Sequence, residues 1–598
     1  MFGFVFKTSK PKTYSKDFVA ILESLAVRYA LCFAHRFDTI TTPFSFYFVI
    51  KGESQQVLDF ANAVSETLPL SIYFVFEKIE PLTPLTAEKD LTQKDTPNES
   101  ATNGRATPKN AKQKITQNLD SIKRFYKTQK SISHIPNVQE TKHILHIFEE
   151  QDSKDLEIFE AYQKRFFTQI FERNMSDLYQ GFIRAIEALR DQKSIAFHTQ
   201  RGVIELSLTQ SDCVLFFELG ALQTFMRVDS VQMGILASFE KPSMRLCAKD
   251  VFRAELIAPH KVDVECMIAF DLMLALFGVV ARKFNIEYVF CLDSATSTKT
   301  SKQSNTENME HIRYKLAYKI PPKQLLVCNK EGIFLEDKKT MQDLFALIKH
   351  HYVPDYTLNH TPNHTPKLDS SPKLHSDKEL IFYLSTAHDT AIWTYDGRAF
   401  HQLLEIEFSL NPNTLLQELE SYTNGDVLIH NYKQHFGRDC LEFGIQSSPN
   451  SKNLIEIFGV IAKILGLCDK NASIAQGVNS VLNYAKLLVR DKGPRIDYKM
   501  LKNSEGVLRL DCPRILRSCM SFALAGVDYP TLCYGILDSL GEFLGNFARD
   551  MQQNYSIYQV FLCGDMLAHK VFLDKITHYL PKNILLTLPQ DGWIDTEK

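Results

Sequence analysis

The chain has 598 residues, far more than one domain usually holds, and this length suggests about three or four domains. Apolar residues make up 44% of it, as in ordinary globular proteins. Lys and Arg number 68 and Asp and Glu number 70. This balance gives no polybasic surface, so binding to nucleic acid or to an anionic membrane is not expected. The 12 cysteines occur without a CxxC pair, which argues against a zinc ribbon or a thioredoxin-like site.

The sequence contains no segment typical of a signal peptide or a membrane span. Its start, MFGFVFKTSKPKTYSKDF, is interrupted by charges and a proline too early for a secretory signal. The most apolar run, residues 267–281, contains Asp271, so it is too short and too polar to cross a bilayer and is predicted to be a buried helix. Scattered thiols fit a reducing compartment, and we expect a cytoplasmic protein.

Three polar stretches interrupt the apolar patterns. Residues 85–124 have no aromatic side chain and are predicted to be disordered. Residues 294–311 form a second polar tract, and residues 355–379 contain the tandem repeat NHTPNHTP. Histidines cluster in and before this repeat, which leaves a metal site open, although a proline-rich loop is the favoured interpretation; they are His350, His351, His360 and His364.

The first 80 residues alternate strand and helix patterns. We expect a helix that begins near Ser15, and a small α+β unit of ferredoxin-like type. The expected strands are residues 4–6, 44–50 and 71–76, and a second helix is expected at residues 55–66.

The rest of the chain is predicted to be of mixed α/β type. A hairpin is expected from Leu380, where two apolar strands flank a short polar turn. Helices are expected at residues 178–189, 534–551 and 566–579, and strands at residues 194–197, 203–208, 213–217, 558–563 and 584–588.

Several segments, in the same order, resemble the HypF family of hydrogenase-maturation carbamoyltransferases. FYFVIKGESQQVLDFANAVSETLP is similar to an acylphosphatase domain, and YQGFIRAIEALRDQKSIAFHTQRGVIELSL, ASFEKPSMRL and AELIAPHKVDVECMIAFDLMLALFG are similar to a YrdC-like domain. FYLSTAHDTAIWTYDG, LIEIFGVIAKILGLCDKN, VFLCGDMLAHKVFLDKITHYL and LPQDGWID resemble the C-terminal transferase domain. Within the family, the chain is most similar to the HypF-related HydE proteins encoded with quinone-reactive nickel–iron hydrogenases.

The resemblance implies a multidomain α/β and α+β protein. Its parts would be a ferredoxin-like acylphosphatase-type domain (1–83), a disordered linker (84–135), a YrdC-like domain (136–354), a linker (355–378) and a C-terminal actin-like ATPase (ASKHA) transferase-type domain (379–598). ATP with Mg²⁺ would be the cofactor.

The resemblance also implies nucleotide-binding residues in the C-terminal domain. Asp389 and Thr390 match the end of the family's Thr-Ser-Cys-Asp-Asp-Thr turn, and Gly564 falls in its Ser-Gly-Gly phosphate loop. Asp591 and Gly592 match its Asn-Asp-Gly end. These residues are expected around one cleft between two lobes, although an Asp-Thr or Asp-Gly turn can also be purely structural.

Other family positions have changed. The acylphosphatase loop lacks its arginine and glycine, the YrdC-like lysine position is His198, and Asp565 stands in the phosphate loop. Catalytic residues therefore stay unassigned. His430 and His435 are weak candidates for a metal site, because residues five apart do not stack on one helix face.

Two functions follow from the resemblance. In the favoured one, the chain is an accessory protein for nickel–iron hydrogenase maturation, a degenerate scaffold that binds the hydrogenase large subunit or another maturation protein. In the alternative, it is an active ATP-dependent carbamoyltransferase that supplies carbamoyl groups for the cyanide ligands of the nickel–iron site.

Overall fold

The structure is a computed structural model, and it divides the chain into two compact units, Met1–Leu325 (unit 1) and Leu326–Lys598 (unit 2). Both predicted linkers, except Lys378, lie outside the described residues, as do the NHTPNHTP repeat, residues 294–309, Asp591 and Gly592. The described residues are 1–8, 15–38, 44–68, 71–82, 175–199, 201–259, 261–292, 310–313, 323–329, 334–336, 339–340, 378–395, 399–444, 449–502, 506–587 and 594–595.

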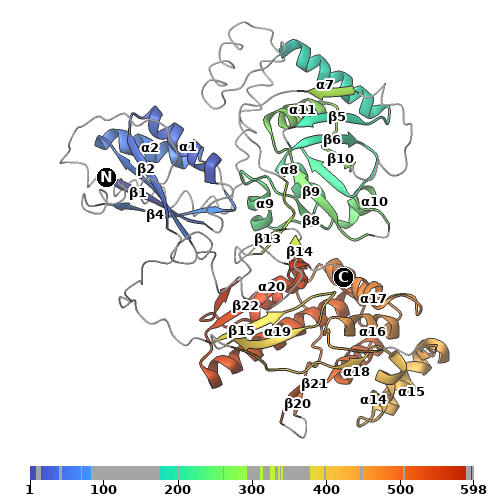
Figure 1. The fold of residues 1–598 in the computed structure, drawn as a ribbon. Coiled ribbons are helices and arrows are strands. Elements are labelled where there is room, and N and C mark those ends of the chain that lie inside the picture. Colours follow the sequence, from blue (N-terminus) through green and yellow to red (C-terminus); the bar gives the residue numbers. More distant parts are fainter. Residues whose placement is uncertain are drawn as a thin grey trace. The chain divides into compact units, whose positions relative to one another are not determined.

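The N-terminal part of unit 1 is a four-stranded sheet with two helices (Figure 1). The strand order is β2-β3-β1-β4, every neighbouring pair is antiparallel, and the β-α-β-β-α-β succession is ferredoxin-like. A core rich in phenylalanine joins helix to sheet; the rings of Phe18 and Phe74, for example, stack at 4.4 Å. The elements are β1 (Phe2–Thr8), α1 (Ser15–Arg28), β2 (Cys32–Asp38), β3 (Phe44–Lys51), α2 (Ser54–Thr67) and β4 (Phe74–Pro81).

The last of these strands begins later than the predicted residue 71. The Ser71 hydroxyl accepts hydrogen bonds from the backbone N–H groups of Tyr73 and Phe74, both at 3.2 Å. This local hydrogen bonding makes a turn of residues that the apolar pattern alone assigns to a strand.

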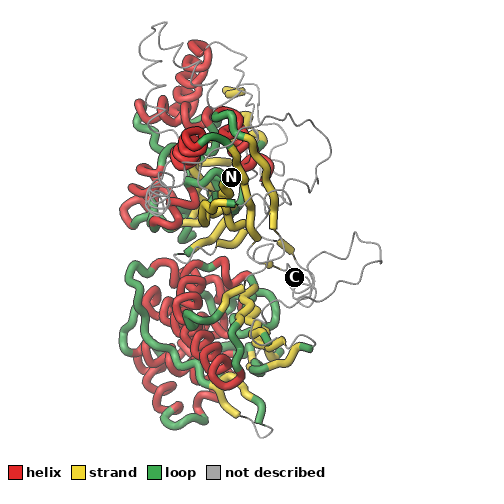
Figure 2. The backbone as a smooth tube through the Cα atoms, turned by 90° about the vertical axis from the view of Figure 1, so that its left-hand side faces the viewer, coloured by secondary structure: helices red, strands yellow, loops and turns green. Residues whose placement is uncertain are grey.

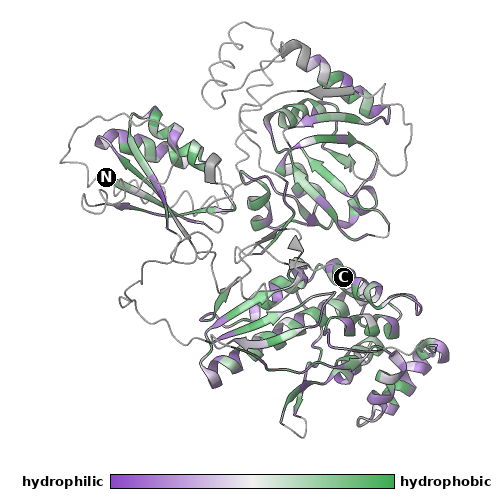
Figure 3. Cartoon of the chain, viewed as in Figure 1, coloured by the Kyte–Doolittle hydropathy of each residue, from purple (hydrophilic) through white to green (hydrophobic). Residues whose placement is uncertain are grey.

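The second part of unit 1 is a seven-stranded sheet in the order β11-β5-β6-β10-β7-β9-β8. Apolar side chains of helices α7 and α11 cover one face of it, and the apolar strands stand out in Figure 3. The strands are β5 (Ile195–Thr199), β6 (Gly202–Ser207), β7 (Cys213–Phe216), β8 (Met244–Leu246), β9 (Val264–Ile268), β10 (Tyr288–Leu292) and β11 (Glu310–Arg313). The helices are α7 (Met175–Arg190), α8 (Leu219–Phe225), α9 (Ser230–Leu236), α10 (Arg253–Leu256) and α11 (Leu272–Lys283).

The prediction of one helix over residues 267–281 was wrong at its start. Met267 and Ile268 end strand β9, and the helix begins only at Leu272. The reason is Asp271, whose carboxylate accepts a hydrogen bond from Leu274 N at 2.8 Å and caps the helix. Among the described residues, none of the helices combines the length and the apolar character needed to cross a membrane.

Unit 2 is built on a five-stranded mixed sheet and is mostly helical (Figure 2). The strand order is β17-β16-β15-β22-β23, with β15 (Glu379–Tyr383), β16 (Ala391–Tyr395), β17 (Phe400–Gln402), β22 (Gln559–Cys563) and β23 (Leu585–Thr587). The helices are α14 (Pro412–Glu420), α15 (Gly425–Phe436), α16 (Glu456–Leu465), α17 (Ile474–Leu487), α18 (Cys512–Leu524), α19 (Tyr529–Tyr555) and α20 (Lys570–Tyr579).

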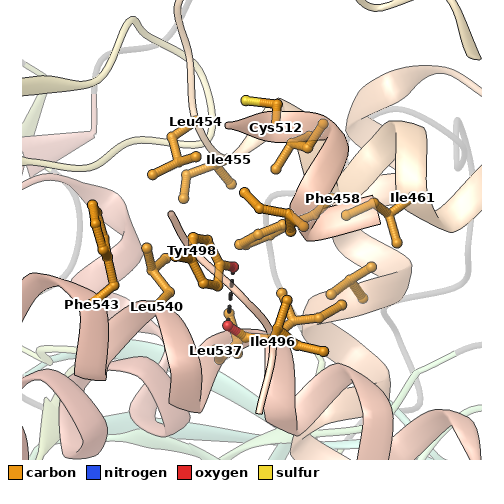
Figure 4. Close-up of a cluster of buried hydrophobic side chains, with 14 of the residues drawn as sticks. Leu454, Ile455, Phe458, Ile461, Ile496, Tyr498, Cys512, Leu537, Leu540 and Phe543 are labelled. Atoms are coloured by element: carbon orange, nitrogen blue, oxygen red, sulfur yellow. Dashed lines mark hydrogen bonds between the residues drawn. The ribbon is translucent and has the colours of Figure 1, made fainter. Parts of the chain in front are cut away.

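Helices α16, α18 and α19 share the large apolar core of unit 2 (Figure 4). Within it, the buried Tyr498 donates its hydroxyl hydrogen bond to Ile536 O at 3.1 Å, so the one polar atom of this ring is satisfied. This core packs against the sheet, whose carboxyl edge carries the candidate site.

Candidate functional site

The candidate site lies at the carboxyl ends of β15 and β22. These strands are parallel neighbours, with Tyr383 opposite Cys563 at their ends. The chain leaves β15 toward β16 on one side and leaves β22 toward α20 and β23 on the other. In open α/β sheets, ligands bind where the strand order reverses in this way. We call residues 384–390 and 564–569 the switch-point loops.

The backbones of the switch-point loops are in direct contact. Leu384 N donates to Cys563 O at 3.0 Å, and Met566 N donates to Leu384 O at 3.2 Å. Gly564, which the sequence predicted as a phosphate-loop residue, lies between these bonds with a φ of 107°. A Cβ atom there would lie 2.0 Å from Leu384 O, so the close approach requires glycine.

The Asp565 carboxylate accepts hydrogen bonds from donors of the opposing loop. Thr386 N donates to one carboxylate oxygen at 2.7 Å and the Thr386 hydroxyl to the other at 2.5 Å. Asp565 is only 8% exposed. Backbone N–H and hydroxyl donors of this kind bind phosphate oxygens in nucleotide sites. Here, a side chain of the protein takes that place.

The two residues predicted from the Asp-Thr turn have different environments. The Thr390 hydroxyl accepts a hydrogen bond from Leu454 N at 2.9 Å, and Thr390 N donates to Lys452 O at 3.1 Å. Thr390 thus fixes the hairpin to the segment before α16, while Asp389 is exposed to solvent. Next to Leu454, the buried Asn453 has a side-chain amide nitrogen without a hydrogen-bond partner among the described residues.

Asp389 and Thr390 directly precede β16, and Gly564 directly follows β22, so these three predicted nucleotide residues lie at one edge of the sheet. The sequence reasoning missed Thr386 and Asn453. The polar run STAHDT could have suggested Thr386, but its partner Asp565 is 179 residues away.

His430 and His435 both lie on α15 and are both exposed. Five helical residues separate them by about 140° around the helix axis, so the two rings face apart. The His435 ring instead packs edge-on against Phe436 at 4.6 Å. In the part of the chain that the structure describes, no three His, Cys, Asp or Glu side chains are grouped as metal ligands. An open hollow of about 450 Å³ beside His430 is lined by Glu420, Asp426, Val427, Ile429, His430 and Lys433.

His198, the residue predicted at the family's lysine position, lies on β5 of the β5–β6 hairpin. Two cations that the sequence did not reveal lie close to this hairpin: Arg201 in its turn, which is largely buried, and the buried Lys241, which follows α9. Arg201 donates to Glu240 O at 2.8 Å and stacks on the Phe270 ring at 4.3 Å. The Lys241 ammonium donates to Ala237 O at 2.6 Å. Burial lowers the pKa of Lys241 to about 7 and that of Arg201 to about 10.

Comparisons with known proteins add a full-length relative. No family model matches the chain. The HydE protein of Wolinella succinogenes is 28% identical over 614 residues, which cover 99% of each chain. A full-length HypF crystallised in the phosphate- and nucleotide-bound form is 11% identical with a TM-score of 0.47, covering 69% of this chain and 84% of that one. The HypF of T. kodakarensis is 11% identical with a TM-score of 0.44, covering 70% and 72%.

Proposed function

We propose that the chain serves nickel–iron hydrogenase maturation as a scaffold. The reason is that it is a HypF-like protein, related to HydE over its full length. It would bind the hydrogenase large subunit or another maturation protein and would no longer transfer carbamoyl groups. The observation that carries this proposal is the carboxylate of Asp565 on the donors of Thr386.

Electrostatics explain why this contact matters. A nucleotide phosphate at the switch-point loops would meet the Asp565 carboxylate at close range and would find Thr386 already bonded. Two like charges about 4 Å apart repel by several kcal/mol where water is largely excluded. An intramolecular carboxylate is also always present, so it competes with every free anion.

The three larger sheets support the domain names that the resemblance implies. We assign an acylphosphatase-type domain to residues 1–83, a YrdC-like domain to 136–354 and an actin-like ATPase-type domain to 379–598, with linkers at 84–135 and 355–378. The ferredoxin-like sheet supports the first assignment, and the switch point between β15 and β22 supports the third.

The alternative, an active ATP-dependent carbamoyltransferase with Mg²⁺, is favoured by two other observations. The Gly564 turn is kept, and the exposed Asp389 carboxylate is available as an oxygen ligand for Mg²⁺. A cation bound between Asp565 and a phosphate would remove the repulsion. His430 and His435 remain proposals for a separate metal site.

Nucleotide binding to the Asp565→Gly variant tests the proposal, because this change restores the family's glycine and frees Thr386. We expect wild-type protein to show no saturable binding of a fluorescent ATP analogue with Mg²⁺ and no carbamoyl-phosphate-dependent exchange between ATP and pyrophosphate. Asp565→Gly should bind the analogue saturably, with a Kd at least about tenfold below the highest protein concentration tested, equivalent to about 1.4 kcal/mol or more. Asp550→Gly, at an exposed position of α19, is the control and should bind like the wild type.

Exchange catalysed by the wild type and abolished by Asp389→Ala would instead establish the active transferase. The partner is tested separately, by affinity capture from cells that express the hydrogenase. We expect the large subunit or a maturation protein in the eluate. Recovery of neither would contradict the scaffold role.

A further inference from the structure

Two cysteines of unit 1 lie directly opposite each other on neighbouring strands. Strands β7 and β10 are antiparallel, with Phe216 opposite Tyr288 and Val214 opposite Phe290. One further step along the same register places Cys213 opposite Cys291. Directly opposite residues of an antiparallel pair point their side chains to the same face of the sheet.

Local hydrogen bonds hold the two cysteines together. The Ser211 hydroxyl bonds to the carbonyl oxygens of both, at 2.8 Å to Cys291 and 3.3 Å to Cys213. The Cys291 side chain, followed by burial, raises the pKa of the Cys213 thiol. Opposite residues of such strands have Cα atoms about 4.5–5.5 Å apart, within the range of about 4.4–6.8 Å that a disulfide spans.

The two thiols differ in access to solvent. Cys213 is 6% exposed and belongs to the core beneath α7 and α11, whereas Cys291 is partly exposed at the border of that core. A dissolved reagent would therefore meet Cys291 first. Cys213 would then be the second, resolving thiol.

A lysine supplies positive charge to this pair. Lys323 is ion-paired with Glu265 at 2.5 Å, and Glu265 is the register partner of Cys213 on β9. The ammonium acts to lower the pKa of Cys213, against the larger effects of Cys291 and of burial. A thiolate beside a cation is the nucleophile that exchange requires.

We propose that Cys213 and Cys291 form a reversible dithiol–disulfide couple that exchanges with small-molecule disulfides. The inference stands on the sheet of unit 1 and does not depend on the hydrogenase proposal. In the first step, the Cys291 thiolate attacks one sulfur of glutathione disulfide and releases one glutathione thiolate. In the second, the Cys213 thiolate attacks the Cys291 sulfur and releases the other. The protein dithiol loses two electrons and two protons, and glutathione disulfide is reduced to two glutathione molecules.

Peptide mapping of the full chain tests the couple. The protein is incubated with glutathione disulfide, alkylated and digested with trypsin without reduction. Residues 202–227 and 284–299 are tryptic peptides with one cysteine each, so a link between them identifies the bond. We expect the linked pair to form, and dithiothreitol to restore both free peptides. Two free thiols, or a glutathione adduct on Cys291 that persists in the wild type, would overturn the proposal.

Four variants sharpen the test. Cys213→Ser should trap the adduct at Cys291, since no second thiol resolves it. Cys32→Ser, which removes an exposed cysteine of β2, should leave the linked peptides unchanged. Lys323→Met should slow disulfide formation about fivefold at pH 7 and move its pH–rate profile upward, whereas Lys193→Met, after α7, should not. An unchanged rate and profile in Lys323→Met would overturn the role of the ammonium.

Discussion

Lys241 is a buried residue of unit 1, and burial lowers the pKa of its ammonium group to about 7. The unfolded chain keeps the ordinary value of 10.5. Below pH 7 both states are charged, and the folded state bears the full cost of the buried charge. Between pH 7 and pH 10.5 the unfolded state binds more protons, so the stability of unit 1 rises with pH in this window.

This reasoning gives a prediction for Lys241→Met. From pH 7 to pH 9, the wild type should gain about 2 kcal/mol of unfolding free energy relative to the variant. Urea unfolding followed by far-UV circular dichroism at both pH values measures this difference. The exposed Lys249→Met is the matched control and should follow the wild type. Both variants retain the buried Glu240, whose raised pKa has the opposite effect on stability. Equal pH dependence in wild type and Lys241→Met would contradict the buried ammonium.

At the scale of elements, helices α19 and α20 pack unusually closely. Gly541 and Gly545 lie four residues apart on α19 and face Lys575 and Tyr579 of α20. A Cβ atom on Gly545 would lie 2.7 Å from the backbone carbonyl of Tyr579. Because the close atoms of Tyr579 include backbone atoms, a change of side-chain rotamer cannot relieve this contact.

For Gly545→Ala, we therefore predict the sign of the change in the free energy of unfolding. Helix propensity alone would stabilise the variant by about 1 kcal/mol. The overpacked contact with α20 should outweigh this gain and give a net destabilisation of about 1–2 kcal/mol. Urea unfolding followed by tryptophan fluorescence measures it, and Asn546→Ala, at an exposed position of the same helix, should stay within about 0.5 kcal/mol. A more stable Gly545→Ala would show that the two helices move apart freely.

The elements show what the sequence could and could not predict. The hairpin after Leu380 and the helix–strand order of the tail were found from local apolar periodicity, which follows the burial of one face. The break after Ile268 was missed, because a single capping aspartate overrides a continuous apolar run.

Contacts between residues of the candidate site that are far apart in the sequence produce no periodic pattern from which they could be predicted. Gly564 was predicted from its motif, and its backbone has a φ of 107°. The hydrogen bond between Thr386 and Asp565 forms only when the sheets form. The same holds for the stacking of Arg201 on Phe270. The buried Lys241 was equally invisible, since its acceptor at Ala237 depends on a local turn with a φ of 43°.

At the scale of the whole molecule, the division into two compact units predicts at least two unfolding transitions, because large chains with several cores seldom unfold in one step. Both tryptophans, Trp393 and Trp593, belong to unit 2, so their fluorescence reports that unit alone, whereas far-UV circular dichroism reports both. We expect the two signals to have different midpoints in urea. Gly545→Ala should lower the fluorescence midpoint only, and Lys241→Met should shift only the remaining dichroism transition. Coincident midpoints that move together in both variants would mean that the units unfold as one cooperative body.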